Sequence, residues 1–184
     1  MEQKISRVEN SPCVLVIGGE KQKRDTKNDK SIVEVSLVET LDLVNKTWTT
    51  SKSLTSKRSR RVNAVTLNGK VYVVGLAQNG TSVERYDPSS DTWATLGNLQ
   101  EQREEAEVVV VNDVMYALLG YKERCEHSSI EKYEINGDYW SKDLAPMATD
   151  EHRVTGWARA VAFQNKIYVT EENTMQVYDP SVDT

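Results

Sequence analysis

A single stretch decides the fold: residues 83–93, with the sequence VERYDPSSDTW. Its tyrosine stands seven residues before its tryptophan, and two other segments repeat this separation. The three pairs are Tyr86 with Trp93, Leu41 with Trp48, and Tyr133 with Trp140. A fourth segment, around Tyr178, follows at a similar distance along the chain. Leu41, Tyr86, Tyr133 and Tyr178 are separated by 45, 47 and 45 residues. The chain therefore contains an internal repeat with a period of about 45 residues.

Outward from this stretch, each unit contains further short β-rich runs. Two apolar runs precede each of the last three copies, and the second run carries a tyrosine: Tyr72, Tyr116 or Tyr168. The two runs are joined by residues that tolerate positive φ, such as Asn68-Gly69 and Asn112-Asp113, which favour a tight antiparallel hairpin. Each unit thus predicts four short strands, with no convincing helical periodicity. Such a unit cannot bury both of its faces alone, and this predicts the stacked blades of a β-propeller.

The run YVVG at residues 72–75, followed by residues 83–93, closely resembles the kelch repeat. The resemblance covers about residues 13–184. The glycine pair of the family is complete at Gly18-Gly19, present in half at Gly75 and at Gly120, and replaced by Glu171-Glu172 in the last copy. The resemblance implies an all-β, kelch-type β-propeller, a partial ring of about four four-stranded blades.

The expected domain organisation is an N-terminal leader at 1–12 followed by blades at about 13–54, 60–97, 106–144 and 157–184. The first blade lacks its innermost strand in the sequence pattern, and the fourth is incomplete at its outermost strand. Propellers close with about four to eight blades. We therefore expect an arc, either the N-terminal two-thirds of a ring or a truncated gene product.

The repeated aromatic and glycine positions are interpreted as structural. A buried aromatic side chain removes roughly 150–250 Å² from water, so regular tryptophans in a repeat are expected to pack between blades rather than to stack on a ligand. The structural set is Gly18, Gly19, Trp48, Tyr72, Gly75, Tyr86, Trp93, Tyr116, Gly120, Tyr133, Trp140, Tyr168 and Tyr178.

Charge is distributed unevenly along the 184 residues, whose formal net charge is −5. Residues 1–70 hold 14 Lys and Arg against 8 Asp and Glu, while the remainder holds 9 against 20. The first part therefore carries +6 and the second −11. A basic cluster of this kind can steer an acidic partner, although it is equally typical of a solvated loop surface. It is not interleaved with aromatic residues, so nucleic acid is not an expected partner.

Several function classes have no support in the sequence. The first 12 residues contain no apolar stretch typical of an export signal, and no run approaches the roughly 18 apolar residues needed to span a membrane, so we expect a cytoplasmic protein. Two cysteines and two histidines show no metal-ligand spacing and no nucleophile arrangement. We expect no enzyme activity, no metal and no cofactor. The copper radical oxidases with a kelch fold need a Cys/Tyr crosslink and a histidine pair, which this sequence does not offer.

Insertions identify the candidate binding surface. The distance between the second-strand and third-strand landmarks is 26, 14, 17 and 10 residues in the four copies, so insertions collect in one connection, at 20–36, 77–82 and 121–129. Insertions in repeat proteins fall on one face, which is often the binding face. The linkers between blades, at 55–61, 100–105 and 148–155, form a second exposed set. The candidate partner-binding residues are Lys21, Lys23, Arg24, Arg58, Arg60, Arg61, Arg103, Tyr121, Lys122, Arg124 and Arg153.

The resemblance implies a protein-protein interaction module that binds a protein or peptide, possibly an acidic one. The leading hypothesis is the substrate-recognition propeller of a BTB-kelch adaptor for a cullin-RING E3 ubiquitin ligase. The BTB region through which such an adaptor would contact the ligase is absent from this chain. An actin-binding cytoskeletal kelch protein is the alternative, and a kelch-fold oxidase is the weakest hypothesis.

Overall fold

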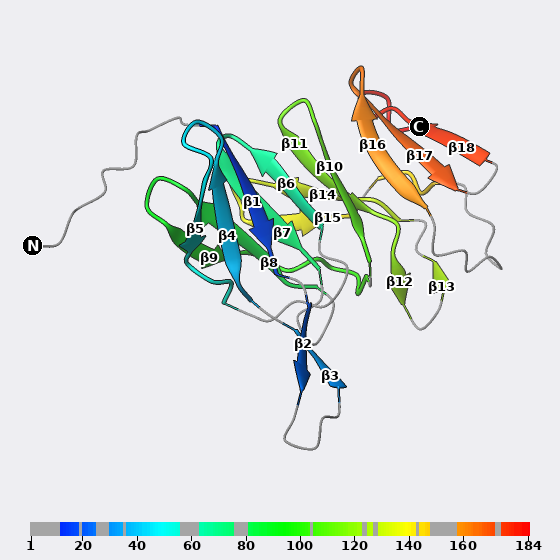
Figure 1. Ribbon diagram of the computed structural model, residues 1–184. Helices are drawn as coiled ribbons and strands as arrows, with labels where there is room; N and C mark the ends of the chain where they lie inside the picture. The colour runs from blue at the N-terminus through cyan, green and yellow to red at the C-terminus, as the bar shows by residue number, and fades with distance from the viewer. Residues whose placement is uncertain are drawn as a thin grey trace, which may run out of the picture.

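The computed structural model describes residues 12–18, 20–24, 30–34, 36–55, 63–75, 81–103, 105–122, 125–126, 129–142, 144–147, 158–171 and 174–184. All regular secondary structure within these ranges is β-strand. The strands form an arc of four antiparallel sheets arranged one beside the next, with two small hairpins projecting from it (Figure 1). The described part of the chain contains no helix long and apolar enough to cross a membrane.

The two central sheets, blades II and III, have four strands each. Blade II comprises β6 (Asn63–Leu67), β7 (Lys70–Val74), β8 (Val83–Asp87) and β9 (Thr92–Thr95). Blade III comprises β10 (Glu107–Val111), β11 (Val114–Leu118), β14 (Glu131–Glu134) and β15 (Tyr139–Ser141). In both blades the strands neighbour one another in chain order, so the four-stranded unit predicted from the repeat is confirmed.

The two outer sheets have three strands each. Blade I comprises β1 (Cys13–Ile17), β4 (Val38–Asp42) and β5 (Thr47–Ser51), and blade IV comprises β16 (Arg159–Phe163), β17 (Lys166–Glu171) and β18 (Thr174–Tyr178). The strand register shows which strand position of blade I is empty. Leu41 of β4 pairs with Trp48 of β5 just as Tyr86 of β8 pairs with Trp93 of β9, so β4 corresponds to β8. Strand β1, which pairs with β4, therefore corresponds to β7, the second strand of blade II. Blade I therefore has no innermost strand among the described residues, and blade IV no outermost strand.

The hairpin turns follow the predicted chemistry. Asn68 and Gly69 have φ of +50° and +70°, and Asn112 and Asp113 have +50° and +60°. Two consecutive left-handed residues give the turn whose twist matches that of antiparallel strands. Asparagine, aspartate and glycine carry the smallest penalty for this conformation, which is why these residues stand there.

Two connections that the sequence predicted as loops contain strands. The insertion after blade I's first strand forms the hairpin β2 (Glu20–Arg24) and β3 (Lys30–Glu34), and the one in blade III forms β12 (Tyr121–Lys122) and β13 (Cys125–Glu126). Strand pairing satisfies backbone N–H and C=O groups that a long irregular loop would leave to water. The insertions are therefore built elements rather than simple loops.

Side chains alternate between the two faces of each blade, and the faces that adjacent blades turn toward each other pack together. Tyr72, Val74 and Val83 of blade II pack on Tyr133 and Trp140 of blade III. The next interface joins blade III to blade IV through the buried residues Tyr116, Leu118, Ile130, Ile167 and Val169. The first interface joins Val38 and Leu54 of blade I to Val73 and Trp93 of blade II. The core is thus a series of inter-blade layers, as stacking of incomplete units requires.

A hydrogen-bonded pair recurs at each interface, where a tyrosine hydroxyl donates to an aspartate Oδ1. The pairs are Tyr86 with Asp91 at 2.7 Å, Tyr133 with Asp138 at 2.7 Å, and Tyr178 with Asp183 at 2.5 Å. The same Oδ1 accepts a backbone N–H from the preceding blade, from Lys52, Gly97 and Ala145 respectively. The three aspartates have φ between +51° and +54°. This device explains why the tyrosine and the tryptophan of the repeat keep a fixed separation around a short turn.

The three repeated tryptophans do not share one environment. Trp140 is 1% exposed, Trp93 is partly buried, and Trp48 is 54% exposed. The prediction that all three pack between blades is therefore wrong for Trp48. The reason is geometric: Trp93 and Trp140 face the preceding blade, and among the described residues no blade precedes blade I.

Candidate functional site

The strand topology separates the connections of the arc into two sets. Successive strands of a blade are antiparallel, so the connection between the second and third strands lies at the same end as the linker to the next blade. The tight turns between first and second and between third and fourth strands lie at the opposite end. Figure 1 shows the hairpins β2–β3 and β12–β13 projecting from the same side of the arc. We call this side the hairpin face, and it is the candidate binding surface.

Two buried glutamates bind the backbone of the linkers at the hairpin face. Glu84 of β8 and Glu131 of β14 are 2% and 0% exposed, although each carries a carboxylate. Glu84 accepts the backbone N–H of Thr55 at 3.0 Å, and Glu131 accepts that of Gln100 at 2.7 Å. Each carboxylate therefore holds the linker that arrives from the preceding blade. The sequence signal for this role was the glutamate two residues before Tyr86 and before Tyr133, and the sequence analysis missed it.

Arg103 belongs to the same support and not to the exposed surface. Its side chain is 0% exposed, which corrects its placement among the partner-binding residues. Its Nε donates to Glu131 Oε1 at 3.0 Å, its Nη1 to the carbonyl of Leu119 at 2.9 Å, and its Nη2 to Ser129 Oγ at 2.6 Å. Burial lowers the pKa of Arg103, and the Glu131 carboxylate opposes this effect. A buried guanidinium persists because its fork is satisfied in several directions.

Of the remaining predicted residues, the structure places five in strands of the hairpin face. Lys21, Lys23 and Arg24 are in β2, where their register partners are Val33, Ser31 and Lys30 of β3. Tyr121 and Lys122 form β12. The structure thus brings these five to one side of the arc, on two separate hairpins. Outside the described residues lie Arg58, Arg60, Arg61, Arg124 and Arg153.

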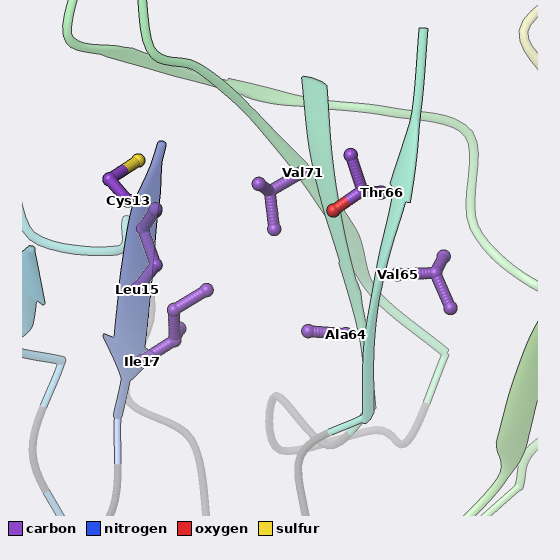
Figure 2. Close-up of a pocket in the computed structure, with 7 residues that line it drawn as sticks. All are labelled: Cys13, Leu15, Ile17, Ala64, Val65, Thr66 and Val71. Carbon is purple, nitrogen blue, oxygen red and sulfur yellow. The ribbon is translucent and has the colours of Figure 1, made fainter. Parts of the chain in front are cut away.

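A pocket of about 210 Å³ lies between blades I and II. It is lined by Cys13, Leu15 and Ile17 of β1 and by Ala64, Val65, Thr66 and Val71 of β6 and β7. Figure 2 shows Ile17 and Ala64 pointing toward one another across it. Among the described strands β1 pairs with β4 alone, so within the described residues its other edge has no paired strand. Its lining side chains are apolar apart from the thiol of Cys13 and the hydroxyl of Thr66.

These features define a repeat protein of the β-propeller class, in which an arc of blades presents two hairpins on one face. No protein-family model matches the chain. Human kelch-like protein 23 is 30% identical over 125 residues, which cover 64% of this chain and 22% of the relative. Rat kelch-like protein 36 is 26% identical over 151 residues, covering 77% and 23%. A putative F-box/kelch-repeat protein of Arabidopsis thaliana is 31% identical over 176 residues, covering 90% and 43%.

Among solved structures, the one titled "Structure of YjhT" superposes with a TM-score of 0.66 at 14% identity, covering 86% of this chain and 55% of that one. This likeness supports the propeller fold. Together the comparisons show that the chain contains a kelch-repeat domain, as the repeat predicted. It spans about a fifth of the length of the two kelch-like relatives and less than half of the F-box/kelch relative.

Proposed function

We propose that this chain is a protein-interaction module that binds a protein or peptide on its hairpin face. The observation that carries the proposal is the common direction of the β2–β3 and β12–β13 hairpins on a rigid arc (Figure 1). Elements that project from a rigid scaffold are the usual carriers of recognition. The linkers beneath them are held by the buried carboxylates Glu84 and Glu131, which limits the entropy lost when a partner binds. The role proposed is binding and not catalysis.

The partner suited to the β2–β3 hairpin is acidic. Strand β2 has the sequence EKQKR, and residues 1–70 together carry a net charge of +6. Opposite charge accelerates encounter and fixes orientation, more than it adds affinity. The basic residues of this proposal are Lys21, Lys23 and Arg24 in β2 and Lys122 in β12.

In the cell, we propose that the chain is the substrate-recognition part of a kelch-like adaptor for a cullin-RING E3 ubiquitin ligase, acting in the cytoplasm. The similarity to kelch-like proteins 23 and 36 and to an F-box/kelch-repeat protein supports this proposal. Because this chain spans only part of those relatives, contact with the ligase would be made by another region. The division of labour is then simple: the hairpin face selects the partner, and the rest of the protein delivers it.

The binding test uses a panel of fluorescent peptides rich in Asp and Glu. Reversal of Lys21, Lys23 and Arg24 to Glu should weaken binding at least about tenfold, and the binding of the unaltered chain should fall as salt rises. Lys46→Glu is the matched control, because Lys46 is an exposed lysine in a turn on the opposite side of the arc. Equal losses in the two variants, or affinity that does not respond to salt, would contradict an acidic partner on this face.

The ligase role has a separate test. A longer protein that contains this chain should co-purify with a cullin, and the β2 variant should lose its substrate but keep the cullin. A variant that loses both, or a protein that recovers actin and no cullin, would contradict the adaptor role and leave the binding face itself unaffected.

A further inference from the structure

The β12–β13 hairpin is too small to fix its own orientation. Its strands, Tyr121–Lys122 and Cys125–Glu126, form a two-stranded sheet of two residue pairs. A two-stranded hairpin by itself is only marginally stable in water. The direction in which it projects from the arc (Figure 1) therefore depends on how its two ends join blade III. These ends are Leu119, which follows β11, and Ser129, which lies two residues before β14, and we call the two residues the hairpin base.

One side chain bonds to both sides of the hairpin base. Arg103 Nη1 donates to the carbonyl of Leu119 at 2.9 Å, and Nη2 donates to Ser129 Oγ at 2.6 Å. Arg103 is 0% exposed and lies in the linker between β9 and β10. The base is therefore held from outside the hairpin, by a residue 16 positions before Leu119 and 26 positions before Ser129.

Blade II closes the corresponding connection in a different way. Gly75 and Leu119 each follow the second strand of their blade, and Ser82 and Ser129 each stand two residues before its buried glutamate. In blade II, Ser82 Oγ donates directly to the carbonyl of Gly75 at 3.2 Å, and the Gly75 N–H donates to the carbonyl of Ser82 at 3.4 Å. In blade III the matching carbonyl and hydroxyl both bond to the guanidinium of Arg103. The guanidinium thus takes the place of a direct bond across the base.

The backbone of the hairpin base is strained at a residue that Arg103 binds. Leu119 has a φ of +58°, in the left-handed region that residues with a Cβ rarely adopt. The matching residue of blade II is a glycine, which has no Cβ. A strained backbone persists only where its surroundings hold it. Because the carbonyl of the buried Leu119 accepts the bond from Arg103, this bond helps to hold the turn from β11 into β12.

The position of the guanidinium is itself fixed. Its Nε donates to Glu131 Oε1 at 3.0 Å, and Glu131 is 0% exposed on β14. The same carboxylate accepts the backbone N–H groups of Gln100 and Glu101 at 2.7 Å and 3.2 Å. A guanidinium presents its donors in a rigid plane, so three bonds in different directions define its orientation. The buried pair therefore ties the hairpin base to the rigid strand β14.

We propose that Arg103 is a positioning residue for recognition, which holds the β12–β13 hairpin in one orientation on the hairpin face. The proposal rests on the proposed function, because it gives this hairpin a share in binding the acidic partner. An element that is already held in its bound orientation reduces the ordering cost of binding. Loss of the bridge should therefore weaken binding mainly through faster dissociation of the partner. It would remove no charge from the surface, because Arg103 is buried.

The test separates the bridge from the buried charge pair. Arg103→Lys keeps a cation beside Glu131, but a lysine has no planar fork with which to bond both sides of the base. In backbone amide NMR relaxation, the order parameters of β12 and β13 should fall from about 0.85 to below about 0.6, while those of β6 to β9 stay unchanged. The affinity for an Asp- and Glu-rich fluorescent peptide that binds the unaltered chain should fall at least about fivefold.

Two serine variants complete the series. Ser129→Ala removes only the acceptor of Nη2 and leaves the pair of Arg103 with Glu131 in place. It should shift the order parameters in the same direction by a smaller amount, and it replaces Arg103→Lys if that variant fails to fold by far-UV circular dichroism. Ser82→Ala is the matched control, because Ser82 occupies the same repeat position in blade II. It should leave the amides of β12 and β13 unchanged.

Unchanged order parameters in both Arg103→Lys and Ser129→Ala overturn the proposal. Mobility that spreads through all four blades overturns it as well, because Arg103 would then serve the fold as a whole. A mobile hairpin with unchanged peptide affinity overturns the role in recognition. If the unaltered chain binds no acidic peptide, the proposed function fails, and the order parameters still decide whether Arg103 positions the hairpin.

Discussion

Truncation of the three repeated tryptophans is expected to give graded losses of stability, because one repeat position samples three degrees of burial. Burial of an aromatic side chain removes roughly 200 Å² from water, worth about 5 kcal/mol at about 25 cal/mol per Å². Measured truncations of buried aromatics cost about 3–5 kcal/mol. Because Trp140 is 1% exposed, Trp140→Ala should lower the free energy of unfolding by about 4–5 kcal/mol. Trp48, at 54% exposed, retains less than half of that burial, so its loss should stay below about 2 kcal/mol.

Trp93 adds a hydrogen bond to the comparison. Its Nε1 donates to the carbonyl of Lys52 at 2.7 Å, whereas the buried Nε1 of Trp140 has no acceptor among the described residues. Substitution by phenylalanine isolates this difference. Trp93→Phe should lose a bond worth about 1 kcal/mol, while Trp140→Phe loses none and removes an unsatisfied donor.

The assay is urea unfolding followed by circular dichroism, at a protein concentration low enough that copies stay apart. The slope of the unfolding curve must remain the same across the series, since a change in slope would signal a change of state rather than of stability. Equal losses for Trp48→Ala and Trp140→Ala would refute the assignment of Trp48 to an uncovered face. A loss below about 1 kcal/mol for Trp140→Ala would refute the inter-blade core itself.

Three further outcomes follow from the structure. Arg103→Ala should lower the free energy of unfolding in urea by about 3–5 kcal/mol, because it leaves the buried Glu131 carboxylate without its charge partner. The double replacement of Arg103 and Glu131 by methionine should cost less than the sum of the two single replacements. Gly97→Ala should destabilise the chain by about 3 kcal/mol, since the added Cβ would overlap a backbone carbonyl of blade III. Gly69→Ala should cost only about 1 kcal/mol, because the added Cβ would have no atom within 4 Å and only the φ of +70° is unfavourable. Hydrogen bonds from a serine and a lysine lower the pKa of Asp179 to about 2. Its contribution to stability is therefore present above its ordinary pKa of 3.8 and is lost as the pH falls toward 2. Between about pH 5 and pH 2, the melting temperature of Asp179→Asn should fall less steeply than that of the unaltered chain.

The fold could be predicted because its signals are local. The separation of Tyr86 from Trp93 reflects one strand, one turn and one returning strand, and residues such as Asn68-Gly69 specify the turn by their tolerance of positive φ. Repetition of these local signals then fixes the number of blades. The three-stranded outer blades were predictable for the same reason, as a local pattern that is incomplete at each end.

The environment of individual residues could not be predicted in this way, because it depends on neighbours distant in the sequence. Trp48 and Trp140 occupy the same repeat position, and only the presence of a preceding blade decides which is buried. Arg103 stands in a charged linker, which suggested exposure. It is buried because Glu131, 28 residues later, offers a carboxylate that requires a cation. An arginine in a linker and a glutamate in a predicted strand were each visible in the sequence, but their pairing belongs to the tertiary structure.

This pairing changes how the basic residues of the first linker should be interpreted. Arg58, which lies outside the described residues, follows Thr55 by the three positions that separate Gln100 from Arg103. Thr55 and Gln100 make the same backbone bond to a buried glutamate of the next blade. The repeat therefore aligns Arg58 in sequence with the buried Arg103, and we expect its charge reversal to affect folding as well as recognition. Binding experiments on this linker separate the two effects only when Arg60 and Arg61 are reversed and Arg58 is kept.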